Sequence, residues 1–287
     1  MGRLIANADD FGLTRGVNRA IAELHQAGLL TSATLMARAA ATDDAIEIAL
    51  ATPSLGVGCH VLLVDGDPVL SAGKLPSLLK RRTGQFLPSL GAFLRRLAAS
   101  HIGSAEIEAE AAAQIALLQA RGLRLTHIDT HKHLHMFSAV LRPVLRAAKA
   151  AGIRTVRNPF EPAWAVRATP GAPLLRRLQV SLLRHLEPTF LRIVAEEGFA
   201  TTDGAIGVLA TGTLDSATVT SLLQNLPQGT FELVTHPGYN DDALARVRTR
   251  LLVSRQVEQA ALHALRQFPE IELISFAAAS SPRPRAS

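Results

Sequence analysis

The sequence has almost no cysteine and few aromatic residues. Cys59 is the only cysteine among 287 residues, so no disulfide can form within the chain, and a reducing compartment is expected. Aromatic residues make up 4% of the chain, and alanine and leucine dominate its hydrophobic 48%. A core of such small side chains favours helices packed closely on a sheet.

Long apolar runs are also missing. No stretch approaches the roughly 18 to 20 apolar residues that cross a bilayer, and the first residues lack the basic and apolar regions of a signal peptide. A cytoplasmic protein is therefore expected. Contact with the surface of the inner membrane stays open at this point.

The net charge of +6 does not come from one basic cluster. Nucleic-acid binders usually gather their basic residues on one face, whereas here the arginines are spread, with small groups at Arg95-Arg96 and Arg176-Arg177. These groups lie beside leucine-rich stretches, which favours a weak peripheral membrane contact over a nucleic-acid partner. A homodimer also stays open.

Strand and helix patterns alternate along the chain. Alternation of this kind predicts an α/β fold of parallel strands joined by right-handed crossovers, in a TIM-like (β/α) barrel. The segments with strand-like patterns are 3–8, 31–36, 55–63, 125–128, 155–157, 207–210, 231–234 and 271–276. The segments with helix-like patterns are 14–27, 42–50, 104–121, 138–151, 172–197, 214–226 and 241–268.

The length fits one barrel domain, predicted over residues 1–279. Two segments interrupt the alternation and are predicted to be loop or cap insertions, at 65–100 and 159–200. The second contains an irregular stretch, 159–171, ahead of a basic, leucine-rich helical part. The Ser/Pro/Arg-rich end, 280–287, is predicted to be a flexible tail.

Polar residues cluster where predicted strands end. Asp9-Asp10 follows the first strand, His60 lies in the third, Asp129 to His135 follows the fourth, and His236 follows the strand at 231–234. The carboxyl ends of barrel strands form one face, on which active sites of such barrels are built. These groups are therefore predicted to converge.

One carboxylate and two imidazoles make a hydrolytic metal site with open positions for water and substrate. A second carboxylate beside the ligand could act as a general base. Each element alone has another interpretation: the Asp9-Asp10 pair is equally typical of a helix cap, and a lone His60 is more typical of a packed core. Four of the ten histidines fall within residues 127–135, which favours function.

At these positions the sequence resembles the YdjC-like (ChbG-type) carbohydrate deacetylases. The matching motifs are Asn7 to Gly12, Gly58 to His60, Thr126 to His135, and Thr235 to Gly238. The resemblance covers nearly the whole chain in order. It implies a distorted, polysaccharide-deacetylase-like barrel that removes acetyl groups from N-acetylated sugars with a divalent metal.

The resemblance also implies roles for individual residues. Asp10, His60 and His131 would hold the metal, Asp9 would be the general base, and His236 would be the general acid. Asp129 would orient a ligand imidazole, while His133 and His135 would support the ligands or contact the substrate. Family members are described with magnesium, whereas imidazole ligands suit zinc or another transition metal.

The sequence indicates the acceptor of the acetyl-bearing sugar less clearly than it indicates the metal site. Val61 to Leu63 departs from the residues that follow the second motif in chitooligosaccharide-type members. The basic segment 172–197, with its stretch Glu187 to Phe190, resembles the hopanoid-biosynthesis-associated (HpnK-like) branch, which implies an N-acetylglucosaminyl lipid headgroup. Two alternatives are retained: a metal-dependent phosphoesterase, and a non-catalytic protein that binds sugars or lipid headgroups.

Overall fold

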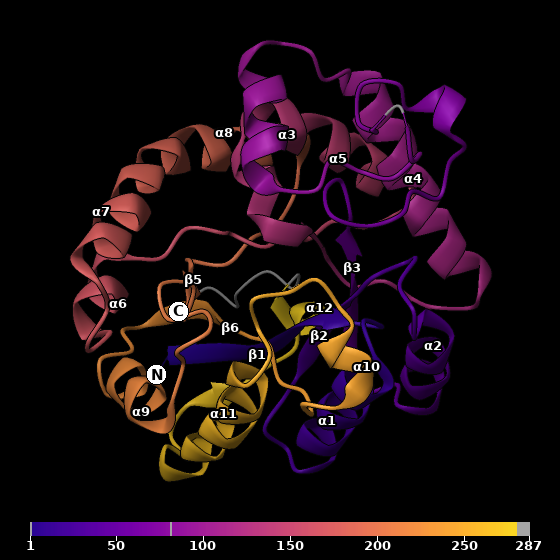
Figure 1. The fold of residues 1–287 in the computed structure, drawn as a ribbon. Helices are drawn as coiled ribbons and strands as arrows, with labels where there is room; N and C mark the ends of the chain where they lie inside the picture. Colours follow the sequence, from indigo (N-terminus) through magenta and orange to yellow (C-terminus); the bar gives the residue numbers. More distant parts are fainter. Residues whose placement is uncertain (1, 81, 280–287) are drawn as a thin grey trace.

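The strands form one parallel sheet that curls around the centre of the molecule (Figure 1). A computed structural model describes residues 2–80 and 82–279. The sheet order is β4-β3-β2-β1-β6-β5, and β7 pairs with β1. The strands are β1 (Gly2–Phe11), β2 (Ser32–Leu35), β3 (Gly56–Val61), β4 (Ile128–Thr130), β5 (Ala205–Ile206), β6 (Gly229–Thr235) and β7 (Glu272–Leu273).

Short backbone ladders continue the curl beyond β4. The Ile128 N–H donates to the Thr155 carbonyl, and the Val156 N–H donates to the Ala200 carbonyl. Residues 155–156 and 200 thus lie between β4 and the segment that leads into β5. The predicted α/β fold with a distorted barrel of parallel strands is therefore confirmed.

Helices surround the sheet, and β1 crosses its middle (Figure 1). The helices are α1 (Arg15–Gln26), α2 (Thr42–Ala51), α3 (Leu90–Ala98), α4 (Ser104–Ala120), α5 (Ser138–Ala150), α6 (Ala163–Ala168), α7 (Leu174–Leu183), α8 (Glu187–Glu197), α9 (Ser216–Gln224), α10 (Asp242–Ala245), α11 (Ser254–Ala261) and α12 (Phe276–Ala279). The 3₁₀ helices within the described residues are η1 (Ala72–Lys74), η2 (His131–Met136), η3 (Arg184–Leu186) and η4 (Leu262–Gln267).

Helix α1 shows why the predicted elements form where they do. The Thr14 hydroxyl accepts a hydrogen bond from the Val17 N–H at 3.2 Å and so caps the helix. Val17, Ile21 and Leu24 recur at helical spacing and are buried on one face. The start of α1 is thereby fixed directly after β1.

The prediction of one helix over 241–268 is wrong. Helix α10 ends at Ala245 and α11 begins at Ser254. Like charges four residues apart, at Arg246 and Arg250, disfavour a helix between them. Tertiary contacts of α11 with the interior of the barrel, described below, then decide where the helix resumes.

Other boundaries shift as well. The predicted strand at 207–210 is replaced by β5 at Ala205–Ile206, because Gly207 has a φ of +86° and ends the strand. The predicted strand at 125–128 lies later, as β4. The stretch 159–171, predicted irregular, contains α6. The tail at 280–287 lies outside the described residues.

The segment 65–100 is held against α4 rather than lying free over the barrel. The buried Glu110 carboxylate accepts from the backbone N–H groups of Val69 and Leu70, at 2.8 and 3.0 Å. The segment includes η1 and α3. Within the described residues, no helix is long and apolar enough to cross a bilayer.

Candidate metal centre and active site

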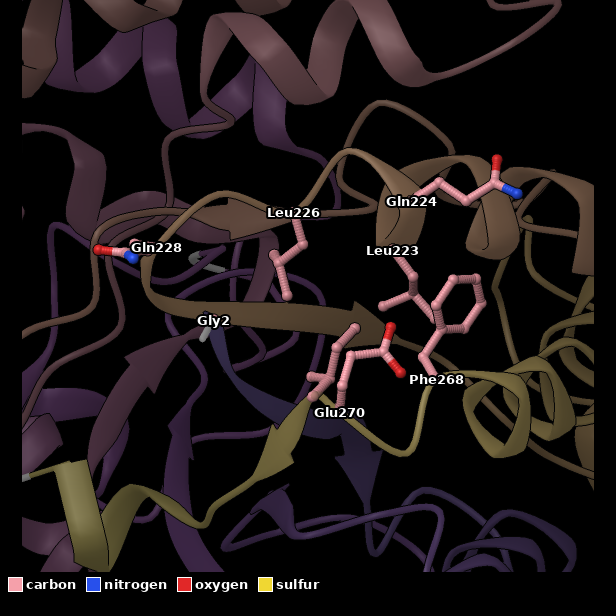
Figure 2. Close-up of a pocket in the computed structure, with 8 residues that line it drawn as sticks. Gly2, Leu223, Gln224, Leu226, Gln228, Phe268 and Glu270 are labelled. Atoms are coloured by element: carbon pink, nitrogen blue, oxygen red, sulfur yellow. The ribbon is translucent and has the colours of Figure 1, made fainter.

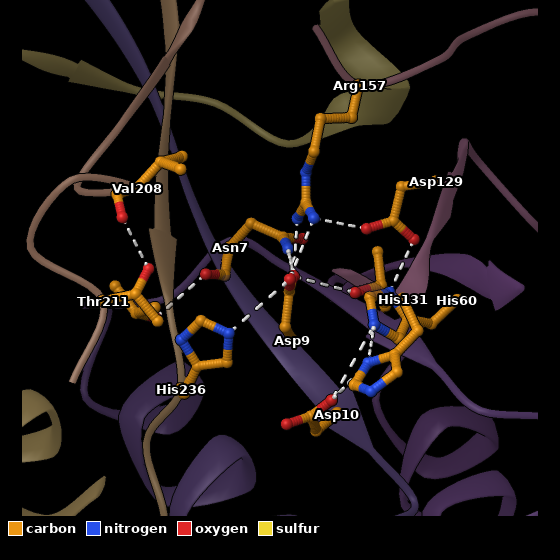
Figure 3. Close-up of polar contacts among 12 residues, drawn as sticks. Asn7, Asp9, Asp10, His60, Asp129, His131, Arg157, Val208, Thr211 and His236 are labelled. Atoms are coloured by element: carbon orange, nitrogen blue, oxygen red, sulfur yellow. Dashed lines mark hydrogen bonds and ion pairs between the residues drawn. The ribbon is translucent and has the colours of Figure 1, made fainter. Parts of the chain in front are cut away.

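An irregularity in β1 points two adjacent carboxylates toward the same end of the sheet. The register of β1 with β2 shifts between Ala8 and Phe11, so β1 holds one extra residue there. Asp10 adopts a φ of +64°, a left-handed conformation that Asp tolerates better than most residues. Because strict alternation is broken, Asp9 and Asp10 both reach the polar cluster (Figure 3).

Asp10, His60 and His131 form a compact triangle of ligand atoms. His60 Nε2 lies 3.3 Å from His131 Nδ1 and 3.8 Å from Asp10 Oδ1, and His131 Nδ1 lies 3.6 Å from the same oxygen. Ligands at about 2.0–2.2 Å from one ion lie about 3–3.6 Å apart, so these three could hold a single metal ion.

The surroundings of Asp10 Oδ1 show whether these three residues suit a cation. This oxygen is buried and has no hydrogen-bond partner among the described residues, which is costly for a carboxylate oxygen. Burial alone would raise the pKa of Asp10, but Arg255 and the nearby histidines lower it, so the group is a carboxylate. An unpaired anionic oxygen between two imidazoles suits a cation.

Asp129 holds the His60 ring from the neighbouring strand. The two residues are register partners across β3 and β4, and the Asp129 carboxylate accepts from His60 Nδ1 at 2.8 Å. Burial alone would lower the pKa of His60, but Asp129, with Asp9 and Asp10, raises it to about 9, so the ring must lose its Nε2 proton when a metal binds. With its Nδ1 hydrogen directed at Asp129, the ring presents Nε2 to the triangle.

The turn after β4 is strained where it presents His131. Lys132 and His133 have φ values of +57° and +53°, two consecutive left-handed residues that are not glycine. The Lys132 ammonium bonds the Asp65 carboxylate at 2.8 Å and so ties the turn to the segment after β3. Burial lowers the pKa of His131 to about 4, which keeps its imidazole neutral and able to bind a metal.

Asp9 is held by a buried arginine rather than left free. Both of its oxygens accept from the Arg157 guanidinium, at 2.9 and 2.5 Å, and Oδ1 also accepts from Asn7 and Thr34, at 3.1 and 3.0 Å. Burial would raise the pKa of Asp9, but Arg157 and His60 hold it well below its usual range. Oδ2 accepts fewer bonds and faces His236, 3.9 Å from its Nε2.

Arg157 binds two further carboxylates, those of Asp129 and Glu232. All four side chains are essentially inaccessible. Asp9, His60 and Asp129 also lie close enough to suggest a second metal group. Because the Arg157 guanidinium already bridges Asp9 and Asp129, positive charge is in place there, and this group does not need a cation.

Helix α11 brings two charged side chains to the other side of the cluster. Arg255 donates to Asp10 Oδ2 at 2.5 Å and is fully buried. Glu258, one turn later, accepts from the His236 backbone N–H at 2.6 Å and lies 3.4 Å from His236 Nδ1. One helix therefore positions both a candidate metal ligand and the candidate acid.

His236 is favoured as a cation by its neighbours. Burial lowers its pKa, but Glu258 and Asp9 more than offset this effect, and the pKa is raised. A protonated imidazole 3.9 Å from Asp9 Oδ2 can donate a proton to a group bound between them.

His133 and His135 lie in η2, directly after His131. His135 Nδ1 pairs with the Thr130 hydroxyl at 2.8 Å, and burial holds its pKa well below the usual range. Burial lowers the pKa of His133 to about 3, and within the described residues its buried Nδ1 has no hydrogen-bond partner. The structure thus brings all eight predicted site residues to one end of the sheet.

Arg157, Glu232, Arg255 and Glu258 are absent from the sequence prediction. A signal existed for two of them: Arg157 ends a predicted strand, as the other clusters do, and Glu232 is a lone charge in an apolar strand. Arg255 and Glu258 fall in the segment predicted as one long helix, and arginine and glutamate on helices are mostly exposed.

Two surface hollows are lined by none of the candidate site residues. A cavity of about 280 Å³ lies at the start of β1, the end of the sheet opposite the polar cluster (Figure 2). Its lining residues are Gly2, Leu223, Gln224, Leu226, Gln228, Phe268, Glu270 and Ile271. A hollow of about 450 Å³ lies beside the loop that follows His236, next to Arg15 and Tyr239. Chemistry, not cavity size, therefore locates the candidate site.

Fold and cluster together define an α/β barrel protein with a candidate carboxylate–imidazole metal centre at the carboxyl ends of its strands. The family model described as YdjC-like protein matches residues 3–268. The chain belongs to this family, as its motifs predicted.

Several relatives of the chain carry the name carbohydrate deacetylase. The chain is 28% identical to the carbohydrate deacetylase of Thermoanaerobacter pseudethanolicus over 91% of both chains, and 31% identical to that of Homo sapiens over 83% of this chain and 75% of the relative. The match to the Brevibacillus brevis carbohydrate deacetylase reaches 42% identity, but spans 55% of this chain and 60% of the relative.

Solved structures share the fold. A putative cellobiose-phosphate cleavage protein from Enterococcus faecalis aligns with a TM-score of 0.78 at 24% identity, over 98% of this chain and 99% of the other. A lactam utilization protein from Thermus thermophilus aligns with a TM-score of 0.52 at 16% identity, over 95% and 99%. At these identities the likeness concerns the fold.

Proposed function

We propose that this protein is a metal-dependent hydrolase that removes the acetyl group from an N-acetyl amino sugar. The observation that carries the proposal is the arrangement around Asp9. The triangle of Asp10, His60 and His131 lies on one side of Asp9, and His236 lies on the other (Figure 3). The names of the relatives support the same activity.

Asp10, His60 and His131 would hold one divalent ion. Such an ion supplies two effects, polarising the acetamide carbonyl and lowering the pKa of a water molecule. The paired imidazoles suit zinc or another late transition metal, whereas resemblance to the family suggests magnesium. Because Arg157 occupies the space between Asp9 and Asp129, the residues support one ion rather than two.

The protein's own residues would move the protons. Asp9, kept ionised by Arg157, takes a proton from the attacking water through Oδ2. His236, kept protonated by Glu258, donates a proton to the nitrogen as its bond to the carbonyl carbon breaks. One water is consumed, and acetate and a free amino sugar are released. His133 and His135 would contact the substrate or support the ligands.

The acceptor is a further part of the proposal. The resemblance of the stretch Glu187 to Phe190 to the HpnK-like branch favours an N-acetylglucosaminyl group on a hopanoid-type lipid over a free chitooligosaccharide. Phe190 connects this stretch to the site, since its ring centroid lies 6.2 Å from that of His135.

Acetate release tests the proposal. The purified protein is assayed on soluble and lipid-linked N-acetylglucosaminyl substrates, before and after chelation and with single metals restored. We expect release that chelation abolishes, and a loss of about 10²–10⁴-fold in kcat for Asp9→Asn with metal binding retained. No release with any metal would reject the hydrolase and favour a binding protein. Two tightly bound ions per chain would favour the phosphoesterase.

A further inference from the structure

Helix α7 (Leu174–Leu183) presents its leucines to the outside of the molecule. None of its ten residues is buried. The described residues include eight large hydrophobic side chains that are exposed, and four of them lie on this helix. Leu174, Leu175, Leu178 and Leu182 are 73%, 68%, 58% and 70% exposed.

The arginines of the same helix point the other way. Arg176 donates to the Val208 carbonyl at 3.4 Å, and Arg177 donates to the carbonyls of Val166 and Thr169 at 3.0 and 2.5 Å. Both arginines are half-buried. A surface helix of a water-soluble domain buries its apolar face, so the polarity of α7 is inverted. An inverted helix indicates that its leucine face meets an apolar surface.

The sequence of α7 and its flanking residues carries charge of one sign. Between Glu161 and Glu187 the chain has four arginines and no carboxylate. Two of them, Arg167 and Arg184, do not take part in the bonds to backbone carbonyls described above. Arg167 is exposed, and Arg184 lies 3.8 Å from Glu187. Leucine on one face with arginine on its flanks is the pattern of helices that lie in the plane of an anionic bilayer surface.

We propose that α7 docks this protein on an anionic lipid surface, with its four leucines (the leucine face) among the headgroups and with Arg167 and Arg184, on the segments that flank the helix, near lipid phosphates. A second copy of the chain fits less well. A stable interface takes about 20–30 residues a side, whereas the leucine face has four, and pairing two α7 helices would bring like charges together. In Figure 1, α7 lies at the outer edge of the molecule between α6 and α8, so its outer face is open to a surface.

Vesicle co-sedimentation tests the docking independently of any turnover. The full chain is mixed with vesicles of equal parts phosphatidylcholine and phosphatidylglycerol, and with vesicles of phosphatidylcholine alone. The variant Leu174→Ser/Leu178→Ser/Leu182→Ser removes most of the leucine face. The matched control Leu50→Ser/Val253→Ser removes two exposed apolar side chains elsewhere, 52% and 65% exposed.

We expect binding to the anionic vesicles that weakens with salt, falls at least about tenfold in the triple variant, and is unchanged in the control. Thermal unfolding checks that each variant is folded, and Leu178→Ser alone replaces the triple variant if that one unfolds. Wild-type protein that stays in the supernatant, or a folded variant that binds as well as wild type, would overturn the proposal. So would a lipid-free dimer that the triple variant dissociates, since the face would then belong to a second copy.

Discussion

Arg157 is the residue whose removal should disturb this molecule most. Its guanidinium is fully buried and bonds the carboxylates of Asp9, Asp129 and Glu232. Arg157→Met keeps an apolar stem of similar length but leaves three buried carboxylates facing one another. Removing one partner of a buried ion pair costs about 3–5 kcal/mol, a large part of the about 5–15 kcal/mol that stabilises a typical domain.

The size of the loss should depend on pH. Burial already raises the pKa of Glu232 to about 7 in the wild-type protein, although Arg157 opposes this effect. A carboxyl group whose pKa is raised by folding destabilises the folded state above that pKa, and the penalty disappears as pH falls toward the unfolded value. Without Arg157 the penalty grows, so the deficit of the variant should be larger at pH 8 than at pH 5.

Urea unfolding followed by circular dichroism measures this effect. The free energy of unfolding of wild type and Arg157→Met is compared at both pH values, with Glu232→Gln as the matched control. Glu232→Gln should lose little stability at pH 8, and the double variant should lose less than Arg157→Met alone. A deficit under about 1 kcal/mol at pH 8, or one that grows as pH falls, would refute the reasoning.

Three further changes probe the candidate site. Asp129→Asn should weaken metal binding by about 10–100-fold, measured by metal titration, because His60 loses the carboxylate that orients it. Glu258→Gln should lower the pKa of His236, so the alkaline limb of the kcat–pH profile should move to lower pH; an unmoved limb would exclude His236 as the acid. Gly58→Ala should destabilise the fold by about 1–3 kcal/mol in thermal unfolding, since its methyl group would lie 2.5 Å from a buried imidazole ring.

Much of the fold and part of the site could be predicted from sequence, for a reason that Asp9-Asp10 and His131 illustrate. Each follows an apolar run of strand length, and parallel strands place their carboxyl ends at one face. The order of strands along the chain therefore indicates which residues meet, even though His131 lies 121 positions after Asp10.

The ends of helices and strands were predicted less accurately, because a local sequence pattern contains no information on tertiary contacts. The sequence pattern predicts one helix over 241–268, yet the structure interrupts it and places α11 where Arg255 reaches Asp10. The inverted polarity of α7 is also a feature that tertiary contacts decide. Its leucines and arginines are evident in the sequence, but periodicity assigns the leucines to the core, and only the packing of the arginines against backbone carbonyls turns them outward.

By itself the sequence determined the alternation of strands and helices and that Asp9, Asp10, His60, His131 and His236 lie in or directly after strands, because both depend on patterns a few residues long. Only the tertiary structure decided which charges balance those residues. Whether a carboxylate stays ionised or an imidazole protonated depends on partners distant in sequence, as Arg157 lies 148 residues from Asp9 and Arg255 lies 245 from Asp10. Burial makes those partners decisive, since unpaired charge is stabilised by water at the surface and by specific neighbours alone in the interior.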